Sequence, residues 1–317
     1  MTKMEFKLLT KREFNEHIPS LNRLFKLAFG RDIHPRFFEW RYLENPIDDL
    51  LVVVAVEDGE VIANYSASPM LFKYNNSVIK TAISMTTMTH PDHNGKGLFT
   101  KLARILYAEM ERKSYSTVWG FPNMNSHGAF IKKLDWKDIY EIPSFSLKLT
   151  KMERDNYCLP EGYEIAEDNN YELLISDDNS PENKFIIQKN QKYYQWRYLS
   201  HPYNQYTNIV LLKNGSTSGN LIFKIYENSI DIIEFNFYSE VEQKIGISYI
   251  VDYGIQNGME SITCWCNIYD SSHSILERYG FQNTTPITYF ASKEISGYSM
   301  STEFKDYIIQ MGDSDVY

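Results

Sequence analysis

The feature of this sequence that most constrains its fold is a ten-residue segment that occurs twice. Residues 37–46 read FFEWRYLENP and residues 193–202 read YYQWRYLSHP, at an offset of 156 residues. Seven of the ten positions agree when the two Phe/Tyr exchanges count as conservative. A fainter repeat relates residues 130–136, FIKKLDW, to residues 275–281, ILERYGF, at an offset of 145. Similar offsets in the same order predict that a whole domain is duplicated.

Hydrophobic periodicity and turn residues predict the same kinds of element in both halves. In the first half we expect a helix over 21–29, strands over 51–56, 61–73 and 78–89, a helix from the glycines to about 113, a strand over 115–120, a helix over 126–134 and a strand over 136–147. In the second half we expect strands over 207–212, 219–226 and 229–237, a helix over 241–256, a strand over 261–266, a helix over 271–279, a strand over 282–292 and a final helix over 301–310. This order predicts an α/β fold with mixed sheets. The expected domains are 1–150 and 184–317, with the polar stretch 151–183 as a linker region.

Composition narrows the class of protein. A formal charge of −9 argues against nucleic acid as the main partner, because phosphate binding needs a basic surface. The first residues lack an apolar signal core, and no apolar run is long enough to span a membrane. Cys264 and Cys266 lack partner ligands at metal-binding spacing, so we expect buried reduced thiols, no metal site and a cytoplasmic protein.

A glycine-bearing turn between a strand and a helix is the strongest chemical signal. The stretch before Thr89 is β-branched and apolar, and after Gly97 the apolar residues recur at helical spacing. Gly95 and Gly97 let the turn expose backbone amides beside the positive end of the helix dipole. The sequence therefore predicts an anion cradle, although a tight turn without a ligand has the same local pattern.

Residues 89–97, THPDHNGKG, resemble motif A of the GNAT acyltransferase superfamily, in which the loop after a central strand binds the pyrophosphate of acetyl-CoA. Residues 123–130, NMNSHGAF, resemble the next motif, in which an Asn holds the pantetheine arm. The resemblance covers roughly residues 1–148 by motif and 184–292 by duplication. It implies two tandem GNAT-like acyl-CoA N-acyltransferase domains, with acetyl-CoA as the cosubstrate.

The resemblance also implies which residues bind the cofactor. They are Thr87, Met88, Thr89, Asn94, Gly95, Lys96, Gly97, Leu98, Phe99, Thr100 and Asn125. Phe99 stands where the family has a small residue, and we expect it to narrow the approach to the phosphates. Lys96 and Lys101 either return positive charge to the cradle or lie on a solvated helix face. Asn125 either holds the pantetheine or, like Ser126, caps the helix.

The second half lacks the cradle, because no glycine turn follows Phe237. Glu240 and Glu242 stand where the pyrophosphate would lie, and carboxylates at a helix start satisfy the dipole themselves and repel phosphate. We therefore expect no acyl-CoA in the second half, as in tandem GNAT proteins in which one half has lost the site.

The residues that many GNAT enzymes use as base and acid are missing. Residues 78–88 contain no carboxylate, and Ile131 stands where the family has a Tyr. His127, in the first turn of its helix, is the candidate acid or base, because His titrates near neutral pH; a surface histidine beside the cap is the alternative. Trp40 and Arg41 recur in the half without a cradle, which favours a role in supporting the fold.

The function implied is acetyl-CoA-dependent N-acetylation of a small polar amine, of which an amino sugar is one candidate. A non-catalytic acyl-CoA-binding module stays open, because the usual acid and base are absent. Transfer of an aminoacyl group from tRNA is a further alternative, but the chain shows neither a coiled-coil arm nor a basic surface. The sequence does not indicate an oligomeric state.

Overall fold

The computed structural model describes residues 4–150, 158–173, 181–315 and 317. They form two compact units. Unit 1 is mostly the first repeat and unit 2 mostly the second, but each unit also contains a stretch of the other repeat. Unit 1 contains Met1–Tyr140 and Tyr289–Thr302, and unit 2 contains Glu141–Thr288 and Glu303–Tyr317. The predicted α/β class with mixed sheets and two domains is confirmed, but the units do not follow the simple boundaries at 150 and 184 that the sequence predicted.

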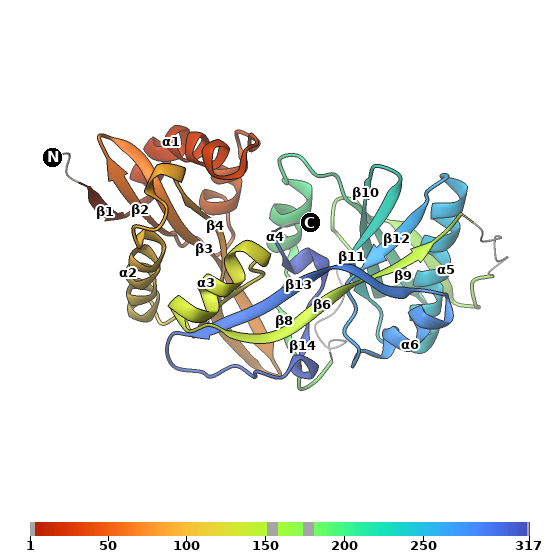
Figure 1. Cartoon of the computed structure of the whole chain (residues 1–317). Helices are drawn as coiled ribbons and strands as arrows, with labels where there is room; N and C mark the ends of the chain where they lie inside the picture. Colours follow the sequence, from red (N-terminus) through yellow and green to blue (C-terminus); the bar gives the residue numbers. More distant parts are fainter. Residues whose placement is uncertain (1–3, 151–157, 174–180, 316) are drawn as a thin grey trace. The chain divides into compact units, whose positions relative to one another are not determined.

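Unit 1 contains the elements in the order that the first half of the sequence predicted (Figure 1). They are β1 (Glu5–Leu8), α1 (Lys11–Phe29), the π-helix η1 (Glu39–Leu43), β2 (Leu51–Glu57), β3 (Glu60–Tyr74), β4 (Ser77–Thr89), the 3₁₀ turn η2 (Pro91–His93), α2 (Leu98–Arg112), β5 (Thr117–Gly120), α3 (Met124–Leu134) and the start of β6 (Lys137–Lys148). Strand β1 was not predicted, and α1 begins ten residues earlier than expected. Thr10 and Glu13 form a capping box that fixes this start.

The sheet of unit 1 is buried on both faces. Leu51, Val53 and Ala55 of β2 belong to the core cluster that contains Leu102 and Leu106 of α2. The residues between them on β2 are also buried, and α1 contacts β3 and β4 (Figure 1). A strand covered on both sides must be apolar throughout, which explains the unbroken run LVVVAV that starts at Leu51.

Unit 2 repeats this order. Its elements are β7 (Tyr163–Glu167), β8 (Phe185–Ile187), α4 (Gln191–Tyr194), the π-helix η4 (Gln195–Leu199), β9 (Thr207–Lys213), β10 (Ser216–Tyr226), β11 (Ser229–Asn236), α5 (Glu240–Gln256), β12 (Ser261–Cys264), α6 (Ser271–Arg278), the start of β13 (Gln282–Glu294), η5 (Phe304–Asp306), β14 (Tyr307–Ile308) and η6 (Met311–Asp313). Strand β7 lies within the predicted linker region 151–183 and pairs with β9; residues 151–157 and 174–180 of that region lie outside the described residues.

Both copies of the repeated motif form a π-helix, η1 and η4, with the Trp, Arg and Tyr side chains buried. A π-helix is rare, so its occurrence at both positions supports duplication independently of the residue matches. Arg197 donates to backbone carbonyl oxygens, including that of Gly312 at 3.2 Å, which confirms the expected supporting role for the second copy.

The last strand of each repeat completes the sheet of the other unit. Ala291–Glu294 of β13 pair antiparallel with β5 of unit 1, where Ala291 lies opposite Gly120. In the reverse direction, Phe145–Lys148 of β6 pair antiparallel with β12 of unit 2. The sequence predicted both strands but assigned each to its own half.

The segment after Thr302 is not the predicted helix. It consists of η5, the two-residue strand β14 and η6, and β14 pairs in parallel with β8. Phe304, Tyr307, Ile309 and Met311 are buried. Because the apolar residues are taken up by contacts within unit 2, tertiary packing overrides the helical pattern that the sequence suggested.

The two cysteines near the end of β12 are reduced, and Cys264 is buried, as predicted. Burial raises the pKa of the Cys264 thiol, and it raises that of half-buried Cys266 to about 12. Among the described residues, no group of three or more His, Cys, Asp or Glu side chains could hold a metal ion. None of the described helices is long and apolar enough to cross a membrane.

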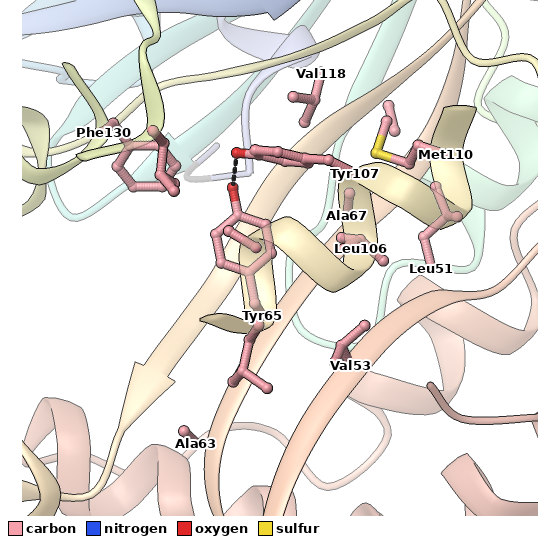
Figure 2. Packing of buried hydrophobic residues seen from close by; sticks show 14 of the residues in the cluster. Leu51, Val53, Ala63, Tyr65, Ala67, Leu106, Tyr107, Met110, Val118 and Phe130 are labelled. Carbon is pink, nitrogen blue, oxygen red and sulfur yellow. Dashed lines mark hydrogen bonds between the residues drawn. The ribbon is translucent and has the colours of Figure 1, made fainter. Parts of the chain in front are cut away.

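A chain of buried hydrogen bonds crosses the core of unit 1. The hydroxyls of Tyr65 and Tyr107 lie 2.7 Å apart, as Figure 2 shows. Trp136 donates its Nε1–H to Tyr107, and the Ser84 hydroxyl donates to Tyr65 at 3.3 Å. Burial raises the pKa of both tyrosines, so they stay protonated. This row of hydrogen bonds connects α2 and β3 with β4 at Ser84.

We expect Tyr65→Phe to lower the free energy of unfolding by about 1–2 kcal/mol, because it removes a buried hydroxyl that forms hydrogen bonds with the hydroxyls of Tyr107 and Ser84. Urea denaturation followed by circular dichroism measures this change. Tyr226→Phe, at an exposed position in unit 2, is the matched control and should change the free energy by less than about 0.5 kcal/mol. An equal change in the free energy of unfolding for the two substitutions would contradict a stabilising role for the buried hydrogen bonds of Tyr65.

Candidate functional site

The candidate site of unit 1 begins where two neighbouring parallel strands separate. Strand β4 pairs with β5 only from Thr81 to Ile83, and then continues to Thr89. Gly120 ends β5, and a Cβ atom built on it would lie 3.0 Å from the backbone oxygen of Ser84. A glycine is therefore needed for the close approach just before the strands diverge. Beyond it, the edge of β4 that faced β5 is no longer paired with that strand.

The end of β4 is held in an unusual conformation by the repeated motif. Thr86 has a φ of +49°, in the left-handed region that a β-branched residue rarely adopts. Its hydroxyl lies 2.5 Å from the Tyr42 hydroxyl, and its carbonyl accepts from Asn64 Nδ2 at 2.8 Å. Tyr42 of η1 thus supports the strand at this bend.

Thr87 follows this bend and carries a polar group without a partner. Its Oγ1 atom is buried and makes no hydrogen bond within the described part of the chain. A buried hydroxyl without a partner costs free energy, and a bound ligand can satisfy it. Met88 is buried and Thr89 is half-buried, so this part of β4 can offer mainly backbone groups.

The predicted glycine turn has the geometry of an anion cradle. Gly95 and Gly97 have φ values of +76° and +75°, and a Cβ built on either would meet no atom within 4 Å. Gly97 is the N-cap of α2, and no side chain caps this helix. The first amides of α2, from Leu98 to Thr100, therefore lack helical partners and lie at the positive end of the dipole.

Side chains at the start of α2 turn inward. Leu98 is buried in the core, and the ring of Phe99 packs against Tyr65 and Phe130 at centroid distances of 5.7 and 5.1 Å. The ring of Phe99 is partly buried against the core, while its backbone amide lies in the first turn; the expectation that Phe99 narrows the approach to the phosphates stays a prediction. Thr100 is half-buried.

The two lysines near the turn have different surroundings. Lys96 is exposed within the turn beside Asn94, and its Nζ lies 3.4 Å from Nδ1 of His93. The Nζ of Lys101 lies 3.6 Å from the centre of the Phe6 ring on β1, as a cation–π contact. Lys96 can therefore supply positive charge at the cradle, whereas Lys101 is engaged elsewhere.

The second predicted motif lies at the start of α3. Asn123 caps the helix, since its Oδ1 accepts from the amides of Asn125 and Ser126 at 3.0 and 3.1 Å. The suggestion that Asn125 or Ser126 is the cap was therefore wrong. Asn125 is exposed and forms no side-chain hydrogen bond among the described residues, so its amide can meet a ligand.

His127 is held by two neighbours within unit 1. Its Nε2 lies 2.6 Å from Oδ1 of Asp138, and its ring stacks on Tyr289 at a centroid distance of 3.9 Å. This leaves Nδ1 as the nitrogen for other contacts. Ile131 packs partly buried against the core, so the position of the missing Tyr is apolar. Whether His127 contacts a substrate stays a prediction.

The corresponding helix of unit 2 begins differently. Ser239 and Glu242 form a capping box at the start of α5. Oε1 of Glu240 lies 2.8 Å from Nζ of Lys244. The residues of this helix therefore satisfy its own amides and dipole, as the sequence predicted. Among the α-helices of the described residues, only α2 has a start that no side chain caps and that follows two nearby glycines.

Comparisons with known proteins show what the first repeat is similar to. Residues 8–139 match the acetyltransferase (GNAT) domain family. A solved structure from Enterococcus faecalis V583 described as "Probable N-Acyltransferase" aligns with a TM-score of 0.71 at 13% identity, over 93% of this chain and 73% of that one. No curated protein sequence matches the chain.

Two further solved structures share the fold. A GCN5-related N-acetyltransferase from Kribbella flavida aligns with a TM-score of 0.70 at 12% identity, over 92% of this chain and 71% of that one. A tandem GNAT protein from the clavulanic acid biosynthesis pathway aligns with a TM-score of 0.59 at 12% identity, over 94% of this chain and 100% of that one. The chain therefore has the fold of GNAT N-acetyltransferases, including a tandem member.

The two asparagines at α3 allow a prediction that separates capping from ligand binding. Asn123→Ala removes the cap, so we expect it to lower the free energy of unfolding by about 1 kcal/mol. Asn125→Ala removes no hydrogen bond of the described chain and should leave stability within about 0.5 kcal/mol of the original. Thermal unfolding of both variants measures the difference. A larger loss for Asn125→Ala would contradict the assignment of the cap.

Proposed function

We propose that this chain, whose residues 8–139 match the GNAT domain, is an N-acyltransferase that takes its acyl group from acetyl-CoA bound to unit 1. The observation that carries the proposal is the uncapped start of α2, which follows the strand β4 that separates from β5. Unpaired amides at a helix start bind phosphate, and a separated strand edge can hydrogen-bond an extended chain.

The residues present fit acyl-CoA. Gly95 and Gly97 leave open space, and Lys96 adds a cation, so the turn can hold the pyrophosphate together with the amides of Leu98, Phe99 and Thr100. The orphaned Thr87 hydroxyl and the backbone of Met88 and Thr89 suit the amide-rich pantetheine arm. The exposed amide of Asn125, and Asn94 on the turn, are the other candidate contacts.

The reaction follows from the chemistry of a thioester and an amine. The amine nitrogen attacks the thioester carbonyl, a C–N bond forms and the C–S bond breaks. One proton must leave the attacking nitrogen, and one must reach the thiolate that departs. His127, paired with Asp138 at 2.6 Å, is the candidate for this proton transfer. The formal charge of −9 favours a cationic acceptor, and we propose a small polar amine such as an amino sugar.

A specific observation keeps a second function open. Strand β4 carries no carboxylate, and Ile131 offers no hydroxyl, so unit 1 lacks two groups that the resemblance would supply. The alternative is a module that binds acyl-CoA without turnover. A thiol-release assay with acetyl-CoA and a panel of amines separates the two, because only the enzyme releases free CoA with an amine.

Substitution of a cradle glycine tests cofactor binding. We expect Gly97→Glu to weaken acetyl-CoA binding at least tenfold, because the new carboxylate repels phosphate and the residue strains the left-handed turn. Isothermal titration calorimetry measures the affinity. Gly215→Glu is the matched control, since Gly215 has a φ of +80° and open space but lies in a hairpin of unit 2. Equal affinity for acetyl-CoA in the original chain, Gly97→Glu and Gly215→Glu would contradict the proposal.

A second substitution tests proton transfer. We expect His127→Gln to lower kcat by about 100-fold, because an amide cannot take up and release the proton. His17→Gln, on α1, is the control and should leave kcat unchanged. Steady-state kinetics measure the effect. An unaltered kcat in His127→Gln would show that another group, or water, moves the proton.

A further inference from the structure

Unit 2 contains the same separation of strands as unit 1. Strand β11 pairs in parallel with β12 only from Ser229 to Asp231, although β11 continues to Asn236. The groove beyond this point is not open, because Ile308, Ile309 and Gln310 line it together with Phe235 and Trp265. Residues 303–315 and 317 are hereafter called the C-terminal segment, and residues 308–310 of it thus lie where unit 1 has its candidate cofactor site.

The C-terminal segment forms hydrogen bonds with both walls of this groove. Gln310 Oε1 accepts from the Phe235 amide of β11 at 2.6 Å, and its Nε2 donates to Asn236 Oδ1 at 2.8 Å. On the other wall, Asn267 Nδ2 donates to the carbonyl oxygens of Phe304 and Tyr307 at 2.9 and 3.1 Å. The side-chain amide of Gln310 therefore bonds to β11 beyond the separation, and the segment is also held by Asn267, which follows β12.

The second copy of the repeated motif holds the end of the segment. Arg197 is buried, and its guanidinium donates to the carbonyl oxygens of Gly312, Ser314 and Tyr317. A guanidinium offers five donors in a fixed plane, which suits several carbonyls at once. The Tyr317 ring packs edge-on against Trp265 at a centroid distance of 5.4 Å.

The segment also balances charge inside unit 2. Lys189 Nζ lies 2.8 Å from a carboxylate oxygen of both Glu234 and Asp313, and all three side chains are buried or nearly so. Burial raises the pKa of Asp313, and although burial alone would lower the pKa of Lys189, the two carboxylates raise it. With Asp313 in place, the buried Lys189 ammonium contacts two carboxylates. Removal of the segment would take one of them away.

Little space is left in the groove once the segment is docked. The remaining cavity has a volume of about 30 Å³ and is lined partly by the segment itself. A space of this size holds about one water molecule. A pantetheine arm does not fit while the segment is present.

We infer that the second groove is a binding site for a peptide segment, and that the C-terminal segment is its resident ligand. The segment takes the place of a cofactor, so each chain binds one acyl-CoA. Only this stoichiometry rests on the proposed function, because the occupancy of the groove by the segment does not depend on it.

Gly312 provides a substitution that displaces the segment from the intact chain. A Cβ built on Gly312 would lie 2.4 Å from the Tyr198 hydroxyl and 3.0 and 3.2 Å from atoms of Ile233 and Glu234. We expect Gly312→Ala to raise amide hydrogen exchange at least tenfold in residues 303–315 and at Phe235. Lys305→Ala, at an exposed position of the same segment, is the matched control and should leave exchange unchanged.

A synthetic peptide of residues 303–317, added to the Gly312→Ala protein, should restore the protection of Phe235. Loss of protection without restoration by the peptide, or an unprotected segment in the original chain, would overturn the inference. If Gly312→Ala does not fold, Gln310→Ala, which removes the contacts with β11, takes its place with the same expected results. Calorimetry should give one acetyl-CoA per chain. Two would overturn the inference, whereas none would contradict only the proposed function.

Discussion

The separation of β4 from β5 after three paired residues is the constraint on which the candidate site depends. It exposes a strand edge in the middle of a sheet, where backbone groups would ordinarily be paired. Gly120 allows the close approach before the separation, and the bond between Tyr42 and Thr86 holds the bend that follows it. The same strand then leads through η2 and the glycine turn to the uncapped start of α2.

Features set by local sequence could be predicted. The hairpins, the strand that leads into Gly95 and Gly97, and the helix that follows all depend on neighbouring residues, and they lie where the sequence placed them. The duplication was visible because the Trp, Arg and Tyr that are buried in each π-helix occur in both copies. The carboxylates at the start of α5 were visible in the sequence, whereas the capping box that Ser239 forms with Glu242 was not predicted.

Features set by distant contacts could not be predicted. The segment after Thr302 is amphipathic enough to suggest a helix, but its conformation depends on Arg197 and Asn267, more than 30 residues away. The inward turn of Phe99 depends on Tyr65 and Phe130. Asn123 and Asn125 are alternative caps by pattern, and only the position where α3 begins decides between them.

The exchange of β6 and β13 between the units has a consequence for how the chain is made. A ribosome releases residues in order, so the β5 edge of unit 1 waits for Ala291–Glu294 long after the rest of its sheet has emerged. Until then an unpaired edge strand is exposed, which is a template for aggregation. The two repeats therefore cannot fold independently, one after the other. The sheet of unit 1 is complete only when nearly all of the second repeat has been synthesised.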